Sequence, residues 1–434
     1  MKMLVPSERW PVLVAAARTP FLESAGAYSE LMSYELGAFA LRGLMERAAL
    51  DPHLVELVVM GTVLHEINTT NVAREAMLKA GLPASIPAYT VAMAGISPSV
   101  GVMNICSEIA LGRMQFGIAG GTENFSDVPI RLSQKIRRTL MKVRQSRDNG
   151  ERVKLLAQLR PWDLKLDLPM SADYTTGLTM GSACEAMVQT FGASRAESDA
   201  FAARSHTTAA AASQAGHYRA QITPVRTDNN TVSVDNSIRP DTSVDTLARL
   251  KPVFDRDKGL ITAGNASRFT DGAGAVLLGA WGQVKAQGLQ PLAIVRDYLL
   301  AGVNALETEM LLGPALTIPK LLERNQLSFD DIGVWEIHEA FATQVLINRQ
   351  CMASPDFIQQ RFGAGFPCGE IPLEKLNAWG GSLALGNPFA ATGVRLLQTA
   401  AQRMQVENQR YAIVATCAGG GLGAALLLEN SSYL

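Results

Sequence analysis

The stretch YTVAMAGISPSVG, residues 89–101, has the pattern of a strand that runs directly into a helix. Its apolar start predicts a strand, Gly95 interrupts the apolar run, and Ser97 and Pro98 are typical of a first helical turn. The first amide groups of a helix lack intrahelical partners and stabilise an anion, so such a junction suits a catalytic nucleophile. The residue here is Gly95, which has no side chain. The sequence therefore predicts a nucleophile position without a nucleophile.

Strand-like and helix-like segments alternate on both sides of this junction. Strands are predicted at residues 12–17, 55–64, 89–93, 116–124, 270–281 and 292–303, a strand followed by a helix at 332–350, and a closing hairpin at 411–429. Helices are predicted at residues 34–48, 71–80, 316–328, after Gly95 and after Asn387. Such alternation is typical of an α/β protein with a mainly parallel sheet covered by helices.

The order of these segments predicts two similar halves with an insertion in the first. In each α/β stretch a turn opens a helix, at Gly95 or Asn387, and a strand with a glycine run follows. Between these stretches, polar residues and short amphipathic helices replace the alternation. The predicted division is an N-terminal half at residues 1–125, an inserted loop domain at 126–255, a return of the N-terminal half at 256–290, and a C-terminal half at 291–434.

The composition excludes several classes of protein. A net charge of −1 gives no general affinity for nucleic acid, and 434 residues are too many for one simple core. The five scattered cysteines match neither a zinc site nor a disulfide framework, which favours a reducing compartment, here the cytoplasm. The first residues show no secretion or transit signal. The uncharged run 411–428 carries glycines at its middle, which favours strand, turn and strand over a membrane helix.

Four motifs in order carry a resemblance to a known family. They are GIAGGTEN (117–124), HEAFA (338–342), GGSLALGNPFAATG (380–393) and CAGGGLGAA (417–425). Together they resemble the thiolase superfamily, and most of all the β-subunits of the fatty-acid oxidation (trifunctional) complex. The resemblance implies the thiolase fold, an α/β fold of two similar βαβαβαββ halves with a loop domain inserted in the first, and a tight homodimer.

The resemblance also implies a mechanism. Thiolases exchange acyl groups between a β-ketoacyl-CoA and CoA, so CoA is a substrate and no other cofactor or metal is expected. One cysteine at a helix N-terminus is acylated, a histidine in a GHP turn activates it, and a second cysteine moves the proton at the α-carbon. Such a cysteine attacks as the thiolate, while hydrogen-bond donors stabilise the oxyanion.

This sequence matches that mechanism in part. By the resemblance, His338 falls on the oxyanion-hole motif, Cys417 on the acid/base cysteine, and Gly419 and Gly420 on the turn whose amides form a second oxyanion hole. Gly95 stands at the family's nucleophile position, and because it lies at the helix start, it is still expected to belong to the oxyanion hole. Asn387 stands at the position of the activating histidine. An asparagine amide cannot act as a base near neutral pH, although it can still donate a hydrogen bond to a thioester oxygen.

Each of these residues also has a purely structural interpretation. His338 could be a buried, satisfied histidine and Cys417 a small apolar core residue, but their places in matched motifs favour the site. Cys106 lies roughly 16 Å along the helix from Gly95 and is too far away to replace the missing thiol. We expect Cys184, Cys351 and Cys368 to lie in inserted or looping segments, without a catalytic role.

Residues 131–165 form a basic amphipathic segment. They contain eleven Lys and Arg against three acidic residues, with apolar residues at helical spacing. This pattern favours contact with anionic phosphates, a membrane surface or a partner subunit, such as the hydratase/dehydrogenase-type subunit of the related complexes. The alternative is a solvated face of the inserted domain.

Three functions remain open from the sequence. The first is enolate chemistry on CoA thioesters without an acyl-cysteine, such as retro-aldol cleavage, decarboxylation or water-mediated β-keto cleavage, using His338, Asn387 and Cys417. The second is a non-catalytic subunit or acyl-CoA-binding partner of a multienzyme complex. The third is an ordinary 3-ketoacyl-CoA thiolase with a substitute nucleophile. Losing nucleophile and base together argues against the third, because the two act as a unit.

Overall fold

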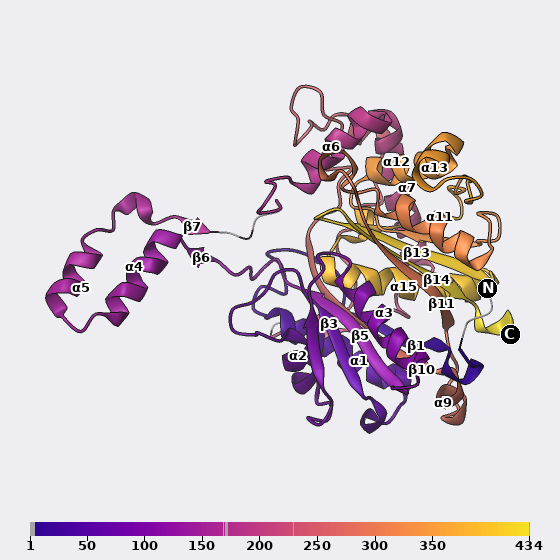
Figure 1. The fold of residues 1–434 in the computed structure, drawn as a ribbon, viewed down its shortest axis with the longest axis horizontal. Helices are drawn as coiled ribbons and strands as arrows, with labels where there is room; N and C mark the ends of the chain where they lie inside the picture. Colours follow the sequence, from indigo (N-terminus) through magenta and orange to yellow (C-terminus); the bar gives the residue numbers. More distant parts are fainter. Residues whose placement is uncertain (1–4, 168, 170–171, 229, 434) are drawn as a thin grey trace.

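The structure is a computed structural model that describes residues 5–433 except 168, 170, 171 and 229 (Figure 1). One large mixed sheet forms its centre. Its strand order is β12-β13-β14-β11-β1-β10-β5-β3-β4, and β2 pairs with β10 outside this order. The strands are β1 (Pro11–Arg18), β2 (Leu22–Glu23), β3 (Leu57–Gly61), β4 (Ala88–Val91), β5 (Phe116–Glu123), β10 (Thr270–Ala280), β11 (Ala293–Gly302), β12 (Val334–Ile337), β13 (Tyr411–Ala418) and β14 (Leu422–Glu429).

The prediction of a mainly parallel sheet is wrong. Only β3 with β4, β3 with β5, and β12 with β13 pair in parallel, whereas all the pairings that involve β1, β10, β11 and β14 are antiparallel. The reason is visible in the closing hairpin, where a glycine turn of three residues leads β13 straight back into β14. So short a connection permits only antiparallel pairing.

The predicted repeat of two halves is present. The first half runs β1, α1 (Ser33–Ala48), β3, α2 (Val72–Ala80), β4, α3 (Ser97–Ala110), β5 and β10, which is the predicted βαβαβαββ order. The second runs β11, α11 (Gly313–Asn325), β12, α12 (Ala342–Ala353), α15 (Phe389–Val406), β13 and β14. Its third strand is reduced to an isolated bridge between Trp335 and Leu376. The halves join where β1 pairs with β11 over two residue pairs.

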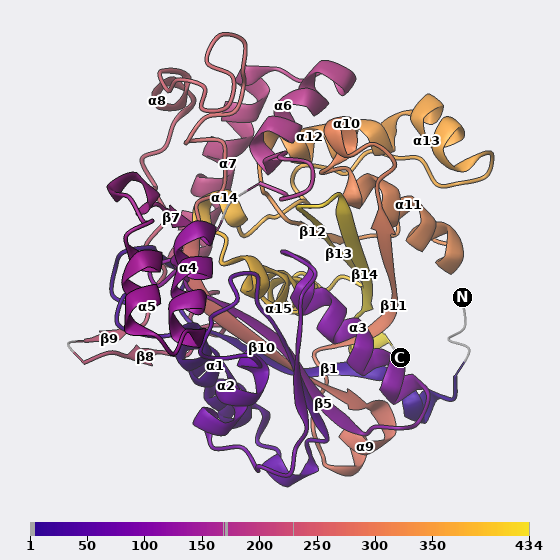
Figure 2. The same ribbon diagram turned by 60° about the vertical axis from the view of Figure 1, so that its left-hand side comes forward.

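Helices α3 and α15, the two that follow the predicted turns, lie side by side at the centre of the molecule (Figure 2). Both pack on strands of the two halves through one apolar cluster. A Cβ at Gly393 of α15 would lie 2.9 Å from Pro98 and 3.0 Å from Ser99 of α3, so the close approach of the helices requires glycine there. This packing brings the first turn of α3 next to the residues before α15.

The other helices surround this centre. Helices α1 and α2 cover the outer face of the first half, and α11 and α12 that of the second. The inserted segment between β5 and β10 contains α6 (Met180–Phe191), α7 (Arg195–Gln214), α8 (Val244–Ala248) and the short strands β8 (Val225–Arg226) and β9 (Thr231–Val232). Short helices complete the fold: α9 (Trp281–Ala286), α10 (Leu306–Glu309), α13 (Pro355–Phe362) and α14 (Ser382–Leu385).

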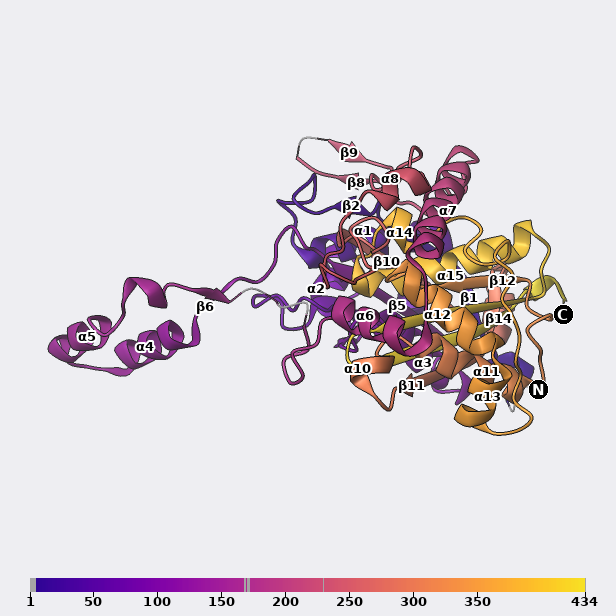
Figure 3. The same ribbon diagram turned by 90° about the horizontal axis from the view of Figure 1, so that it is seen from above.

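A helical hairpin projects from the inserted segment away from the rest of the molecule (Figures 1 and 3). This antenna, residues 131–167, consists of β6 (Arg131–Leu132), α4 (Gln134–Gln145), α5 (Asn149–Leu156) and β7 (Leu166–Asp167). Its base closes through the antiparallel pair β6 and β7. The predicted helical spacing of its apolar residues is confirmed in α4, yet Leu140, Met141 and Trp162 are exposed.

Two further expectations are settled by the structure. The run 411–428 forms two strands and a turn, as predicted, and no helix of the described residues has the length and apolar character to cross a membrane. Cys184 lies in α6 of the insertion and Cys368 in a loop. Cys351, in contrast, lies in α12, because that helix continues one turn beyond its predicted end, so its placement in a looping segment was wrong.

Candidate active site

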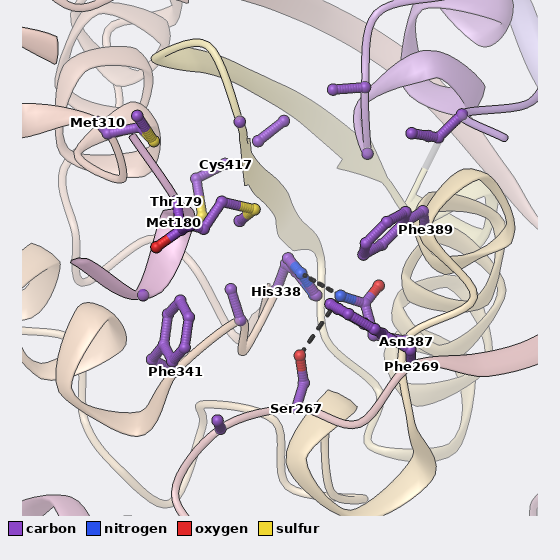
Figure 4. A pocket seen from close by; sticks show the side chains of 18 of the residues that line it. Thr179, Met180, Ser267, Phe269, Met310, His338, Phe341, Asn387, Phe389 and Cys417 are labelled. Atoms are coloured by element: carbon purple, nitrogen blue, oxygen red, sulfur yellow. Dashed lines mark hydrogen bonds between the residues drawn. The ribbon is translucent and has the colours of Figure 1, made fainter. Parts of the chain in front are cut away.

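A cavity of about 330 Å³ lies where the two halves and the inserted segment meet (Figure 4). The first half contributes the loop before α3, the second half contributes His338, Asn387 and the end of β13, and the insertion contributes residues 172–173 and 178–181. The cavity thus joins segments that are more than 300 residues apart in the chain. Five of the six predicted site residues line it directly: Gly95, His338, Asn387, Cys417 and Gly419.

Gly95 lies in the cavity wall, and neither packing nor backbone conformation requires a glycine there. Among the described residues, and apart from its two chain neighbours, the only heavy atom within 4 Å of the position of a Cβ on Gly95 is the Cβ of Ala418, at an ordinary contact distance of 3.9 Å. The positive φ of this loop belongs instead to Ala94, at +47°, where an alanine is strained. Ser97 holds the loop, since its hydroxyl donates to Ala94 O at 2.7 Å and accepts from Met93 N at 2.8 Å.

His338 follows β12 and presents a neutral imidazole to the cavity. Its backbone amide donates to Ala415 O at 2.9 Å, and its Nδ1 lies 3.0 Å from the hydroxyl of Ser382. Burial lowers the pKa of His338 to about 3, and the nearby charge of Arg395 adds to the shift. The ring is therefore uncharged at neutral pH and is suited to hydrogen bonding.

Asn387 lies beside His338, immediately before α15. Its Oδ1 accepts a hydrogen bond from Thr392 at 2.9 Å, which orients the amide group. Its Nδ2 lies 3.3 Å from the Ser267 hydroxyl and 3.4 Å from His338 Nε2 (Figure 4). The asparagine thus presents an NH₂ group to the side of the cavity where the imidazole lies, in agreement with a donor and not a base.

Cys417 and the glycine turn form the opposite wall. Burial raises the pKa of the Cys417 thiol to about 12, so at neutral pH this group is a thiol that can donate a proton. Gly419 lines the cavity, whereas Gly420, with φ of +77°, lies at the tip of the turn and is not part of the lining. The predicted role of Gly420 in an oxyanion hole therefore has no support from the cavity geometry.

Several lining residues escaped the sequence analysis. Asp173 of the insertion is the most consequential, because its Oδ1 lies 3.8 Å from the position of a Cβ on Gly419 and adds a carboxylate to the cavity. Phe269 and Phe389 also line the cavity and pack edge to face, with ring centroids 5.1 Å apart. No sequence motif indicated Asp173, since it lies in a polar segment without periodic pattern. Among the described residues, no group of acidic, histidine and cysteine side chains could hold a metal ion.

The fold and this cavity define an α/β protein of two similar halves with a binding site where the halves and the insertion meet. Two family models match the chain, the thiolase N-terminal domain at residues 11–280 and the thiolase C-terminal domain at residues 289–430. The chain therefore belongs to the thiolase family of acyl-CoA acyltransferases, which confirms the fold and the family expected from the four motifs.

Individual relatives show which members of the thiolase family the chain is similar to. The chain is 40% identical to the mitochondrial trifunctional enzyme subunit beta of Mus musculus over 98% of its length and 89% of the relative. It is 41% identical to a probable 3-ketoacyl-CoA thiolase of Caenorhabditis elegans, with 96% and 93% covered. Among solved structures, the acetyl-CoA acetyltransferase of Bacillus anthracis superposes with a TM-score of 0.83 at 30% identity, with 97% and 98% covered. Human mitochondrial 3-ketoacyl-CoA thiolase in complex with CoA gives 0.82 at 28%, with 99% and 100% covered.

Proposed function

We propose that this thiolase-family protein binds CoA thioesters in the cavity and acts on them through an enolate, without forming an acyl-cysteine. The observation that carries the proposal is Gly95, an open position in the cavity wall where a nucleophile would stand. Asn387, which replaces the activating histidine, removes the base as well. Both losses leave the hydrogen-bonding groups of the cavity in place.

The remaining groups support carbon–carbon bond cleavage. When the bond between Cα and Cβ of a β-substituted acyl-CoA breaks, its electron pair moves onto the thioester oxygen as an enolate. N–H groups of His338 and Asn387 would stabilise that oxygen, and one such donor contributes about 3–4 kcal/mol in other enzymes. The Cys417 thiol then protonates the α-carbon, a role that fits its raised pKa. In decarboxylation CO₂ leaves, and in retro-aldol cleavage the β-hydroxyl proton passes to Asp173.

CoA enters this proposal as part of the substrate, with no resident cofactor. A related solved structure, human mitochondrial 3-ketoacyl-CoA thiolase, is described in complex with CoA, and its fold matches over 99% of this chain. The lining of the cavity is largely apolar apart from the groups already named, which suits an acyl chain. The length of that chain and the direction of the reaction are left open by the proposal.

A non-catalytic role is the alternative that specific observations favour. The relatives at 40% identity are subunits of a trifunctional enzyme, and a subunit that only binds acyl-CoA needs neither nucleophile nor base. An ordinary thiolase with a substitute nucleophile is less well supported. Burial raises the thiol pKa of Cys106, Cys184 and Cys351 as well as that of Cys417, so none of these is a ready thiolate.

We further propose a homodimer in the cytoplasm, with the antenna as the contact to an anionic membrane or a partner subunit. All five cysteines are free, in agreement with a reducing compartment. Among the described residues, the antenna's main contacts are between α4 and α5 and between β6 and β7 (Figure 1), and it combines exposed apolar side chains with the basic residues of 131–165. Packing within the fold therefore does not account for its composition.

Intact-protein mass spectrometry tests the main proposal. The protein is incubated with acetyl-CoA and with a long 3-ketoacyl-CoA, while CoA-containing products are followed in parallel. We expect product without an acyl adduct. An adduct on the protein would refute the argument from Gly95 and reveal a substitute nucleophile, and neither adduct nor product, with binding retained, would favour the non-catalytic subunit.

A further inference from the structure

A buried row of polar side chains lies behind His338. Arg395 of α15 is fully buried and donates from Nη2 to the Ser382 hydroxyl at 2.8 Å, and that hydroxyl lies 3.0 Å from His338 Nδ1. On its other side, Arg395 Nη1 lies 3.8 Å from a carboxylate oxygen of Glu336. The buried hydroxyl of Ser382 thus connects the Arg395 cation to the ring nitrogen that faces away from the cavity.

The protons of this row can be assigned by counting donors and acceptors. A guanidinium only donates, so the Ser382 oxygen accepts from Arg395 and its own proton needs another acceptor. Among the described residues, the only acceptor within hydrogen-bonding distance of that hydroxyl is His338 Nδ1. The reverse arrangement, with Nδ1 donating, would let Nε2 accept from Asn387 Nδ2 over a long contact of 3.4 Å, but it would leave the Ser382 proton buried without a partner, which is the larger loss.

We propose that Arg395, acting through the Ser382 hydroxyl, fixes His338 as the neutral tautomer that carries its proton on Nε2, so that this N–H points into the cavity as a donor. Arg395 and Ser382 are then positioning residues for His338. This assignment does not follow from the motif HEAFA, because both residues that set it come from elsewhere in the chain.

The electrostatics of the row favour the same tautomer. A cation on the Nδ1 side attracts the unprotonated nitrogen of the ring and repels a proton there. Glu336 shares its charge between Arg395 and Arg403, and it bonds Arg403 more closely, at 2.8 Å. Two nitrogens of Arg395, Nε and Nη1, have no hydrogen-bond partner among the described residues. The charge of Arg395 is therefore only partly compensated, and Ser382 is its one hydrogen-bond acceptor there.

The consequence is a pair of donors. With a proton on Nε2, His338 and Asn387 present two N–H groups from nitrogens 3.4 Å apart, so the long contact drawn between them in Figure 4 is given up and both groups can donate to a third atom. Two donors that close together are best satisfied by one oxygen that accepts from both. His338 can then stabilise an enolate oxygen but cannot abstract a proton. This catalytic consequence rests on the proposed function, whereas the tautomer itself does not.

Nitrogen-15 NMR of the ligand-free protein tests the tautomer directly. The chain has five histidines, so selective labelling gives few signals, and His338→Gln identifies the one of interest. We expect an unprotonated Nδ1 and a protonated Nε2 at neutral pH, with at least about a tenfold preference over the other tautomer. A proton on Nδ1, or on both nitrogens, would overturn the proposal.

Variants separate positioning from mere packing. Ser382→Ala and Arg395→Met should each shift the tautomer ratio of His338 toward Nδ1–H by about tenfold, and Ser382→Thr should restore it. Ser205→Ala is the matched control, because it removes another buried hydroxyl, one that donates to Glu339 at 2.7 Å. If Arg395→Met does not fold, Ser382→Ala carries the test, and an unchanged ratio in that variant contradicts the proposal. Loss of the proposed enolate chemistry would leave these spectra unaffected.

Discussion

Placing a cysteine at position 95 and a histidine at position 387 should turn the cavity into an acylation site. Gly95→Cys places a thiol at the start of α3, where its Cβ meets only Ala418 at 3.9 Å. Gly95 does not have a positive φ, so a side chain adds no backbone strain, and the free energy of unfolding should change by no more than about 1 kcal/mol. The thiol would face the amides of the first helical turn, which favour its thiolate.

The expected rates follow from what each substitution supplies. Gly95→Cys alone should form an acyl adduct slowly, because Asn387 cannot take the proton of the thiol. Asn387→His alone should form none. The double variant should acylate about 10²–10⁴ times faster than Gly95→Cys, which is the usual contribution of a general base. The effect is non-additive, since nucleophile and base act as a unit.

A time course by intact-protein mass spectrometry measures this. Each variant is mixed with acetyl-CoA or a 3-ketoacyl-CoA, the adduct and the released CoA are quantified, and thermal unfolding shows that each variant is folded. Gly95→Ser is the matched control, since it fills the same space without a thiol. A folded double variant that never acylates would refute the reasoning that this cavity lacks only two groups of an acyl-transfer site.

Three further predictions follow from the same structure. Wild type should lose about 2 kcal/mol more unfolding free energy between pH 7 and pH 5 than His338→Gln, because the pKa of His338 lies near 3 when folded and 6.5 when unfolded, so protons bind the unfolded chain first. Urea unfolding at both pH values checks this, and equal losses would contradict it. Cys417→Ala should slow deuterium incorporation at the α-carbon of the product about 10²-fold or more, whereas Asp173→Asn should slow only the cleavage of β-hydroxy substrates. If the rate of deuterium incorporation is the same in Cys417→Ala as in wild type, the thiol takes no part in the mechanism. Replacing residues 133–165 by a short turn should leave the melting temperature and CoA-thioester binding unchanged but abolish binding to anionic vesicles or to the partner subunit, and a drop in thermal stability would show instead that the antenna supports the fold.

Local sequence patterns were sufficient for the elements of the fold but not for their pairing. The strand and helix around residue 95 appear where their apolar run and Ser97–Pro98 signal placed them. The direction of the strands was mispredicted, because alternation of strands and helices says nothing about strands that return through the insertion, such as β10. That strand pairs with β5 only after an intervening segment of more than 140 residues. Such long-range pairing leaves no local trace in the sequence.

The site residues likewise divide into those that local motifs indicate and those that only contacts in the folded chain indicate. Motif resemblance placed His338, Asn387 and Cys417 in one cavity, since each lies next to a recognisable turn. It could not find Asp173, which comes from the antenna's return to the body, nor Ser382 and Arg395, whose importance depends on the hydrogen bonds they make across the chain. Residues that act through another side chain are identified by contacts, and contacts require the folded structure.

The loop before α3 favours the proposed ligand binding over a cavity that has merely lost its function. A positive φ at Ala94 costs free energy, of order 1–3 kcal/mol for strained sites in general, and a glycine at that position would relieve it. The glycine stands one residue later, at Gly95, where the backbone does not need it and the space opens into the cavity. In a loop that binds no ligand, we would expect a residue that relieves the strain at position 94, such as glycine. The chain has the strained turn, held by Ser97, together with an open position at Gly95. That combination leaves room for a ligand beside the two N–H donors proposed for His338 and Asn387, and the proposed enolate chemistry without an acyl-cysteine needs this room.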